Sequence, residues 1–243
     1  MIPNKDAYGQ EILAYFKGKK VPEIIERDDG HIDLSGGPEI YFSKYKEWHY
    51  HEKKALKFVK GRVLDVGCGA GRISLYLQNK GFDVVGIDNS PLAAKVCKQR
   101  GFKKVKVIPI SEVDKLKSTF DSIIMFGNNF GLFGSFKKAR ILLKKFSEIT
   151  SQNAVIIAES LNPYKTNNPV HIEYHKLNKK RGRMVGQLKI RVRFEKCIGD
   201  WFDYLFVSKQ EMKEIFKGTG WKIKGFIDSK SPHYIAIIEK ISN

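Results

Sequence analysis

The chain has 243 residues, enough for one large or two small domains with a sizeable buried core, and its formal net charge is +18. It shows neither an apolar run long enough to cross a bilayer nor a basic-then-apolar signal pattern, and its three cysteines, Cys68, Cys97 and Cys197, have no metal-ligand spacing. These features predict a reduced cytoplasmic protein without a membrane span or a metal ion, whose basic surface fits either a polyanionic partner or a lysine-rich composition.

Residues 1–57 are predicted to form an N-terminal helical cap. Apolar residues at helical spacing indicate a helix over residues 7–17, which Gly18 ends, and a second helix is expected over residues 41–60. Turn signals lie between them, at residues 28–30 and 35–38. We expect most aromatic side chains of this segment to pack internally, with one or two reaching a ligand.

Residues 58–160 alternate between short apolar runs and helical segments. The runs predict strands at residues 62–66, 82–87, 105–109, 120–126 and 154–160, and the helical segments lie at residues 71–80, 90–100 and 135–150. Ser90 and Pro91 are a good N-cap and first-turn pair for the second of these helices. This alternation is typical of an α/β fold with a mainly parallel sheet that helices cover on both faces.

The first strand of this region leads into an acid and three glycines at alternate positions. Asp65 precedes Gly67, Gly69 and Gly71, and the next strand ends one helix-length later in Asp88. Glycines allow left-handed backbone angles and a close approach to a ligand, and an acid at the end of the neighbouring strand accepts hydrogen bonds from a ribose diol. The pattern therefore predicts a site for an adenosine whose 5′ side lies on the glycine loop.

Several interpretations of this glycine loop compete. A phosphate-binding P-loop is excluded because no Gly-Lys-Ser/Thr sequence ends the loop. A dinucleotide site has a different glycine spacing, and the carboxylate of Asp65 would repel a pyrophosphate, whereas it suits the amino group and sulfonium of S-adenosylmethionine. A strand-turn-helix corner without a ligand is the alternative, and the joint presence of Asp65, the glycine triplet and Asp88 argues against it.

Across about residues 58–160, the chain resembles the class I, Rossmann-like S-adenosylmethionine-dependent methyltransferases. Val63 to Gly71 is similar to the first motif of that family, and Gly86-Ile87-Asp88-Asn89-Ser90-Pro91 is similar to its acidic second motif. The resemblance implies a Rossmann-like seven-stranded sheet, S-adenosyl-L-methionine as methyl donor, S-adenosyl-L-homocysteine as product and an N-terminal segment that caps the cofactor. Glu112 and Val113 stand where the family usually has an Asp-Ala pair. The cofactor-binding residues that the resemblance implies are Asp65, Gly67, Cys68, Gly69, Gly71, Asp88, Asn89, Glu112, Val113 and Gly127.

Residues 161–207 interrupt the alternation and predict an antiparallel β insert on the substrate side, after the fifth strand. Apolar and cationic side chains alternate over residues 188–194, and we expect partner strands at residues 171–177 and 201–207. Residues 208–243 then complete the core, with a capping box of Ser208 and Glu211 that opens a helix. Apolar runs at residues 221–228 and 234–240 predict a closing antiparallel hairpin.

Catalytic residues are poorly marked in this sequence. Methyl transfer is an in-line displacement from a neutral sulfur leaving group, so it needs no acid, and it needs a base only where the acceptor must lose a proton. Asn128 lies in a Gly-Asn stretch that resembles small-molecule N-methyltransferases of the glycine-methylating type, and Tyr174 lies on the insert. Both are candidates, although Asn128 fits the role of a turn cap equally well. His49, His51 and His233 are expected at the surface or in packing.

Three functions stay open at this stage. The first is a methyltransferase for a small molecule whose identity and methylated atom the sequence does not name. The second is a tRNA or rRNA methyltransferase whose insert binds phosphates through Lys179, Lys180, Arg181, Arg183, Lys189, Arg191 and Arg193, although no recognisable RNA-binding module accompanies them. The third is a cofactor-binding partner subunit that has lost catalysis. The oligomeric state is equally open.

Overall fold

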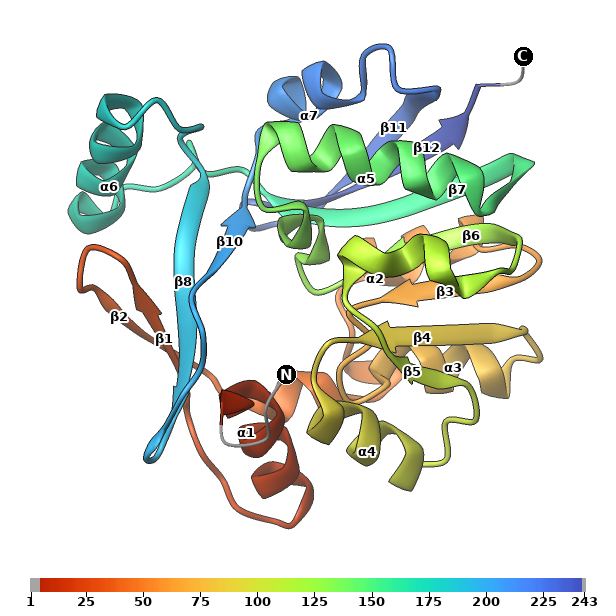
Figure 1. Ribbon diagram of the computed structural model, residues 1–243, viewed down its shortest axis with the longest axis horizontal. Helices are drawn as coiled ribbons and strands as arrows, with labels where there is room; N and C mark the ends of the chain where they lie inside the picture. The colour runs from red at the N-terminus through yellow and green to blue at the C-terminus, as the bar shows by residue number, and fades with distance from the viewer. Residues whose placement is uncertain (1–4, 242–243) are drawn as a thin grey trace. The chain divides into compact units, whose positions relative to one another are not determined.

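The computed structural model describes residues 5–241, and its helices and strands alternate along most of the chain (Figure 1). The helices are α1 (Ala7–Phe16), α2 (Tyr50–Ala55), α3 (Arg72–Asn79), α4 (Pro91–Gln99), α5 (Phe136–Glu148), α6 (Pro169–Lys180) and α7 (Lys209–Phe216). The strands are β1 (Glu23–Arg27), β2 (Ile32–Ser35), β3 (Val63–Val66), β4 (Val84–Asp88), β5 (Val105–Val107), β6 (Phe120–Met125), β7 (Thr150–Leu161), β8 (Gln187–Phe194), β9 (Cys197–Ile198), β10 (Phe202–Leu205), β11 (Trp221–Asp228) and β12 (His233–Lys240). Short 3₁₀ turns are η2 (Pro38–Phe42), η3 (Tyr45–Glu47), η4 (Leu56–Phe58), η5 (Ile110–Leu116) and η6 (Asn129–Phe133). None of the helices within residues 5–241 has the length and apolar character that a membrane span requires.

Seven strands form one mixed sheet in the order β11-β12-β7-β6-β3-β4-β5. β4 pairs with β5 in parallel, and β6 pairs with β7 in parallel. β12 runs antiparallel to both β7 and β11, which is the closing hairpin that the sequence predicts. The predicted α/β fold with a Rossmann-like, mainly parallel seven-stranded sheet is confirmed.

The described chain divides into two compact units. The first comprises the residues up to Trp48, Leu64–Glu112 and Lys189–Phe202. The second comprises His49–Val63, Val113–Leu188 and the residues from Asp203 onward.

The central strands are short and apolar because they are buried on both faces. Every residue of β3 (Val-Leu-Asp-Val) and of β4 (Val-Val-Gly-Ile-Asp) is buried. Two acids, Asp65 and Asp88, are thereby carried into the interior of the first unit. A buried carboxyl group is unfavourable unless hydrogen-bond donors surround it, so each of these acids requires local partners.

The continuous helix predicted for residues 41–60 is wrong. That stretch forms the turns η2 and η3, the short helix α2 and the turn η4. Trp48 and His49 are extended, with ψ angles of 150° and 153°, and a new helix begins after His49. The carboxylate of Glu52 accepts a hydrogen bond from the amide of His49 at 3.0 Å, which ends one segment and starts the next.

The strand predicted for residues 171–177 is also wrong, because this stretch lies within α6. Asn168 caps the helix by accepting a hydrogen bond from the amide of Val170 at 3.0 Å, and Pro169 occupies the first helical position. Asn-Pro is the same kind of start signal as the Ser90-Pro91 pair of α4. The local signal for a helix therefore outweighs the weak alternation of the following residues.

The N-terminal segment is not purely helical, because it contributes a β-hairpin. β1 pairs with β2 around a turn at residues 28–30, and β1 also pairs antiparallel with β8. With β9 and β10 these strands form a second, five-stranded sheet (Figure 1). The predicted antiparallel insert therefore exists at β8 and β10, and strands from the N-terminal segment extend it.

Candidate functional site

The loop that follows β3 in the first unit has a left-handed backbone at its three alternate glycines. Gly67, Gly69 and Gly71 have φ angles of 72°, 51° and 82°. A Cβ atom at Gly69 would lie 2.9 Å from the hydroxyl oxygen of Tyr8, and one at Gly71 would lie 2.6 Å from Sγ of Cys97. Glycine is therefore required at Gly69 and Gly71 both for conformation and for space.

Backbone hydrogen bonds fasten this loop to the end of β4. The amides of Gly67 and Cys68 both donate to the carbonyl oxygen of Ile87, at 2.9 and 3.0 Å. The amide of Gly69 donates to Oδ2 of Asp88 at 2.9 Å. The loop and the acid at the neighbouring strand end are thus held as one structural element.

Asp88 is buried and hydrogen-bonded at both oxygens. In addition to the bond from the loop, Oδ1 accepts a hydrogen bond from the amide of Ser90 at 2.9 Å. Burial raises the pKa of Asp88 to about 6, although the backbone donors favour its charged form, and the nearby charge of Asp6 raises it further. The carboxyl group is therefore mostly ionised at neutral pH and sensitive to mild acid.

Asp65 is the second buried acid of the first unit. Its Oδ2 accepts a hydrogen bond from the hydroxyl of Ser74 at 2.6 Å, which links β3 to α3. Burial raises the pKa of Asp65 to about 6, while the Ser74 hydrogen bond and the charge of Arg72 oppose that rise. A negative charge near the glycine loop thus persists at neutral pH.

Helix α1 lies against this region through Asp6 and Tyr8. Oδ1 of Asp6 accepts a hydrogen bond from the amide of Gly9 at 2.9 Å, and Oδ2 accepts one from the hydroxyl of Ser90 at 2.8 Å. Asp6 therefore caps α1 and also holds the residue that caps α4. The sequence-based prediction gave no role to either Asp6 or Tyr8. Asp6 stands directly before the first predicted helix, where aspartate is a common N-cap residue, so its capping role could have been predicted from the sequence.

The other predicted cofactor residues have varied surroundings. Cys68 is buried and Asn89 is exposed, both in the first unit, and Glu112 lies at a kink of η5 with φ of −112°. Val113 is fully buried and Gly127 is exposed, and both belong to the second unit. The structure therefore brings together seven of the ten predicted residues around the glycine loop and Asp88, with Glu112 elsewhere in the same unit.

In the second unit, the turn after β6 is left-handed at two successive residues. Gly127 and Asn128 have φ angles of 66° and 63°. The carbonyl oxygen of Asn128 accepts hydrogen bonds from the hydroxyl of Tyr204 at 2.7 Å and from the amide of Gly131 at 2.8 Å. Its side-chain Oδ1 is buried and has no hydrogen-bond partner among residues 5–241. Asn128 stands at the N-cap position of η6 without a capping hydrogen bond from its side chain, and it stays a candidate ligand-binding residue.

Tyr174, the other catalytic candidate, is one of the largest fully buried side chains and lies on α6. Its burial on a helix rather than on a strand differs from the predicted insert. The structure gives it the position of a packing residue of the second unit.

The cationic strand β8 is partly neutralised by the N-terminal hairpin. Nε and Nη2 of Arg191 donate to the two carboxylate oxygens of Glu26, at 2.8 and 2.9 Å, and Nη1 of Arg193 lies 3.3 Å from Oε2 of Glu26. The guanidinium of Arg191 also lies 4.4 Å from the ring centroid of Trp201. These contacts engage two of the arginines that the RNA hypothesis relies on.

Comparison with known proteins agrees with this geometry. Residues 57–220 match the family described as "Methyltransferase domain". The chain belongs to this methyltransferase family. Its fold is similar to that of an S-adenosylmethionine-dependent methyltransferase from Bacteroides fragilis, solved in complex with S-adenosyl-L-homocysteine, at a TM-score of 0.84 and 24% identity over 99% of this chain and 97% of that chain.

Two curated relatives match parts of the sequence. A putative methyltransferase, YqeM, of Bacillus subtilis is 33% identical over 33% of this chain and 34% of its own length. A ubiquinone biosynthesis O-methyltransferase of Azorhizobium caulinodans is 26% identical over 46% of this chain and 45% of its own length. The chain thus spans between about a third and a half of the length of the curated relatives it matches. The resemblance to class I methyltransferases is confirmed at the level of family and fold.

Proposed function

We propose that this protein transfers the methyl group of S-adenosylmethionine to a small-molecule acceptor. The observation that carries the proposal is a left-handed glycine loop with two buried, ionisable acids beside it, Asp65 and Asp88. Both acids are mostly ionised at neutral pH, because the pKa of each is about 6. A ligand that brings a cationic group and a hydroxyl pair suits this charge distribution.

Asp88 retains capacity for a ribose hydroxyl. Its oxygens accept hydrogen bonds from the amides of Gly69 and Ser90, and the backbone of Asn89 contributes a third, whereas an ionised carboxylate has about four acceptor positions. One position therefore stays open for a ligand hydroxyl, while Asp65 supplies negative charge for an amino group. The donor, when bound, supplies a methyl group on a sulfonium, and the protein's contribution is to orient it and to exclude water.

The residues that we propose for cofactor binding follow from this arrangement. Asp65 and Asp88 supply the acidic groups, and the backbone of the loop supplies a close approach without side chains. The hydroxyl of Tyr8 on α1 lies close to Gly69, so a side chain at that position would meet it. The full set in the first unit is Asp65, Gly67, Cys68, Gly69, Gly71, Asp88, Asn89 and Glu112. Binding by Val113 and Gly127 stays a prediction of the sequence resemblance.

Two observations favour a small molecule over RNA as the acceptor. Arg191 and Arg193 form ion pairs with Glu26, so these two guanidinium groups of β8 are less available to phosphates than the sequence indicates. The buried, unpartnered Oδ1 of Asn128 suits a hydrogen bond from a compact acceptor. One of the matched relatives is an O-methyltransferase of ubiquinone biosynthesis, which fits an acceptor of this size class.

Calorimetry and labelling test the proposal. S-adenosyl-L-homocysteine and S-adenosylmethionine should bind with micromolar or tighter affinity, whereas NAD and ATP should not. Tritiated methyl from the donor should then enter the low-molecular-mass fraction of a cell extract rather than its RNA. Tight binding of NAD or ATP without binding of either sulfur compound would overturn the assignment of the donor, and label in RNA alone would overturn that of the acceptor.

We also propose a cytoplasmic location. Cys68, Cys97 and Cys197 are all free thiols in the structure. Free buried thiols fit a reducing compartment. Fractionation of source cells with an antibody against this chain checks the location, and recovery from an extracellular fraction would contradict it.

A further inference from the structure

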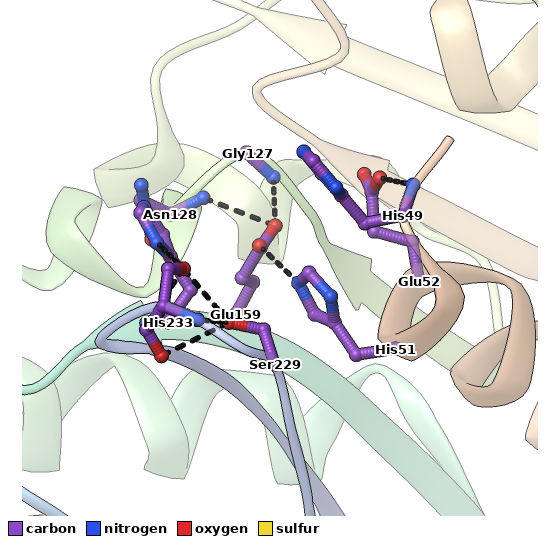
Figure 2. Close-up of polar contacts among 9 residues, drawn as sticks. His49, His51, Glu52, Gly127, Asn128, Glu159, Ser229 and His233 are labelled. Carbon is purple, nitrogen blue, oxygen red and sulfur yellow. Dashed lines mark hydrogen bonds and ion pairs between the residues drawn. The ribbon is translucent and has the colours of Figure 1, made fainter. Parts of the chain in front are cut away.

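The second unit contains a cluster of polar side chains beside the turn after β6, in which His51, Glu52 and Glu159 are buried, His233 is half-buried and His49 is exposed. We call it the histidine–glutamate cluster; it consists of His49, His51 and Glu52 around the start of α2, Glu159 on β7 and His233 at the start of β12. Glu159 and His51 are its centre, with exposed fractions of only 6% and 3%. Figure 2 shows the His51 ring and the amide of Gly127 directed at the two carboxylate oxygens of Glu159.

Glu159 connects helix α2 to the Gly127–Asn128 turn. Its Oε1 lies 3.0 Å from Nε2 of His51, and its Oε2 accepts hydrogen bonds from the amides of Gly127 at 2.6 Å and Asn128 at 3.4 Å. An ionised carboxylate only accepts hydrogen bonds, so Nε2 of His51 carries the proton in this contact. Burial alone would raise the pKa of Glu159, but the hydrogen bond from His51, its charge and the amide of Gly127 hold that pKa below its usual value.

The turn that Glu159 holds is conformationally demanding. A left-handed non-glycine residue such as Asn128 is strained by roughly 1 kcal/mol, and such residues persist only where their surroundings hold them. Glu159 binds the amides on the N-terminal side of Asn128, and Tyr204 binds its carbonyl oxygen. The outcome is a side chain whose Oδ1 is buried without a partner among the described residues. A buried acceptor without a donor is unfavourable by about 1–3 kcal/mol. A structure that holds it there is arranged to receive a donor.

We infer that Glu159 and His51 are positioning residues for methyl transfer: through the Gly127–Asn128 turn they hold Oδ1 of Asn128 ready to accept a hydrogen bond from the methyl acceptor. The acceptor is then a compound whose nucleophilic atom carries a hydrogen, namely an amine, a hydroxyl or a thiol. This inference rests on the proposed methyltransferase function. In this inference Glu159 and His51 act through the turn, since Glu159 accepts a hydrogen bond from the amide of Gly127 and Nε2 of His51 lies 3.0 Å from Glu159.

A pair of substitutions at His51 separates positioning from other roles. His51→Gln keeps an N–H donor for Glu159, whereas His51→Leu removes it. Rates are measured with tritiated S-adenosylmethionine and the low-molecular-mass extract fraction at fixed concentration. We expect His51→Gln to keep at least half of the wild-type rate and His51→Leu to lose roughly tenfold to a hundredfold, because a displaced reacting geometry is that costly. Equal losses in both variants would make His51 a proton acceptor and overturn the inference.

Glu159→Gln gives a readout that does not depend on activity. A glutamine amide offers one oxygen and one NH₂ group, so it no longer accepts from both the Gly127 amide and His51. The Gly127 amide can only donate, so the glutamine oxygen should stay with Gly127 and its NH₂ group should face His51. We therefore expect ¹⁵N spectra to show that Nε2 of His51 has lost its proton and accepts a hydrogen bond. We also expect an upfield shift of the Gly127 amide proton, because a neutral oxygen is a weaker acceptor than a carboxylate. Unchanged His51 and Gly127 resonances would contradict the inference.

Glu52→Gln is the matched control for this experiment. Glu52 is buried on the same helix turn and caps α2 by accepting a hydrogen bond from the amide of His49. We expect it to lower Tm without changing the Gly127 resonance or the methylation rate. Binding of S-adenosyl-L-homocysteine is measured for every variant. If the wild type and Glu159→Gln bind S-adenosyl-L-homocysteine equally well and methylate at equal rates, the positioning role is refuted while the proposed function stands. If the wild type does not bind S-adenosyl-L-homocysteine, the proposed function itself is refuted.

Discussion

At the scale of single residues, the acidic groups beside the glycine loop make cofactor binding sensitive to pH. The pKa of Asp65 and that of Asp88 are each raised to about 6, from ordinary values near 4, chiefly by burial. Binding of a ribose diol and an amino group requires the ionised forms, so affinity falls as pH decreases through 6. Calorimetry with S-adenosyl-L-homocysteine should show an association constant lower by roughly tenfold for each acid at pH 5 than at pH 8. A flat profile would contradict the assignment of both acids.

Replacement of Asp88 tests the same group directly. Asp88→Asn keeps the side-chain shape but removes the charge, and its NH₂ group opposes one of the backbone amides that now donate to it. The loss of charge-assisted hydrogen bonds, about 1.5–3 kcal/mol, should weaken binding of S-adenosyl-L-homocysteine by roughly tenfold to a hundredfold. Asp83→Asn is the matched control, because Asp83 is an exposed partner of Lys104 in the same unit. Equal affinities in the two variants would remove Asp88 from the site.

Glu11 is a buried acid whose ionised form is unfavourable to the stability of the folded protein. It is fully buried, and burial, followed by the charge of Glu23 and a side-chain interaction with Glu23, raises its pKa to about 10. The folded state therefore binds this proton more tightly than the unfolded state. The resulting stabilisation is complete below about pH 4.5 and declines as pH rises toward 10.

Removing that ionisable group should therefore stabilise the protein at alkaline pH. We expect Glu11→Gln to raise Tm at pH 9 by about 2–4 °C for each kcal/mol gained, and to leave Tm unchanged near pH 4.5. Differential scanning calorimetry at both pH values measures the effect. Glu39→Gln, at an exposed position, should change neither value. A lower Tm for Glu11→Gln at pH 9 would show that the carboxylate has a partner that stabilises it.

At the scale of elements, start signals explain both what the sequence predicted and what it did not. The helices that begin at Pro91 and Lys209 were predicted from their caps at Ser90 and Ser208, and the structure confirms both. Asn168-Pro169 carries the same signal for α6, yet the stretch that follows was assigned to a strand. A local cap is therefore better evidence for a helix than a short alternation of apolar residues.

Long-range partners are the part that the sequence does not reveal. The glycine loop and Asp88 were found because their residue types are fixed by local backbone geometry and by ligand chemistry. The pairing of Glu159 with His51 joins residues 108 positions apart, and neither has a neighbour in sequence that marks it. For the same reason, the charge pattern along β8 did not predict that Glu26, 165 positions away in the sequence, pairs with Arg191.

The cap of α6 is a testable element. Asn168→Ala removes the hydrogen bond to the amide of Val170 and should destabilise the protein by about 1 kcal/mol. For a chain of this size, that loss lowers Tm by roughly 2–4 °C. Asn167→Ala, at the neighbouring exposed position, is the control and should leave Tm within experimental error. If both variants melt alike, α6 does not depend on this cap.

At the scale of the whole molecule, the net charge of +18 is distributed rather than concentrated on β8. Exposed lysines pair with acids on many elements, as Lys104 does with Asp83 and Lys224 with Glu239. Such pairs contribute little to stability but dilute any single basic patch. Binding of a polyanion should therefore depend on total charge and not on the position of particular cations.

That expectation separates nonspecific attraction from an RNA-binding site. Arg191→Gln with Arg193→Gln removes two cations that Glu26 already engages, and Lys213→Gln with Lys217→Gln removes two exposed cations on or beside α7. Affinity for mixed tRNA is measured between about 50 and 200 mM salt, where each phosphate contact contributes a slope of roughly −0.7 to −0.9. We expect weak binding, with the arginine pair reducing the slope no more than the lysine pair. Because Glu26 would be left without its partners, Tm is recorded for both variants. If the arginine pair abolished binding and the lysine pair left it intact, β8 would be a phosphate-binding surface and RNA would replace a small molecule as the favoured acceptor.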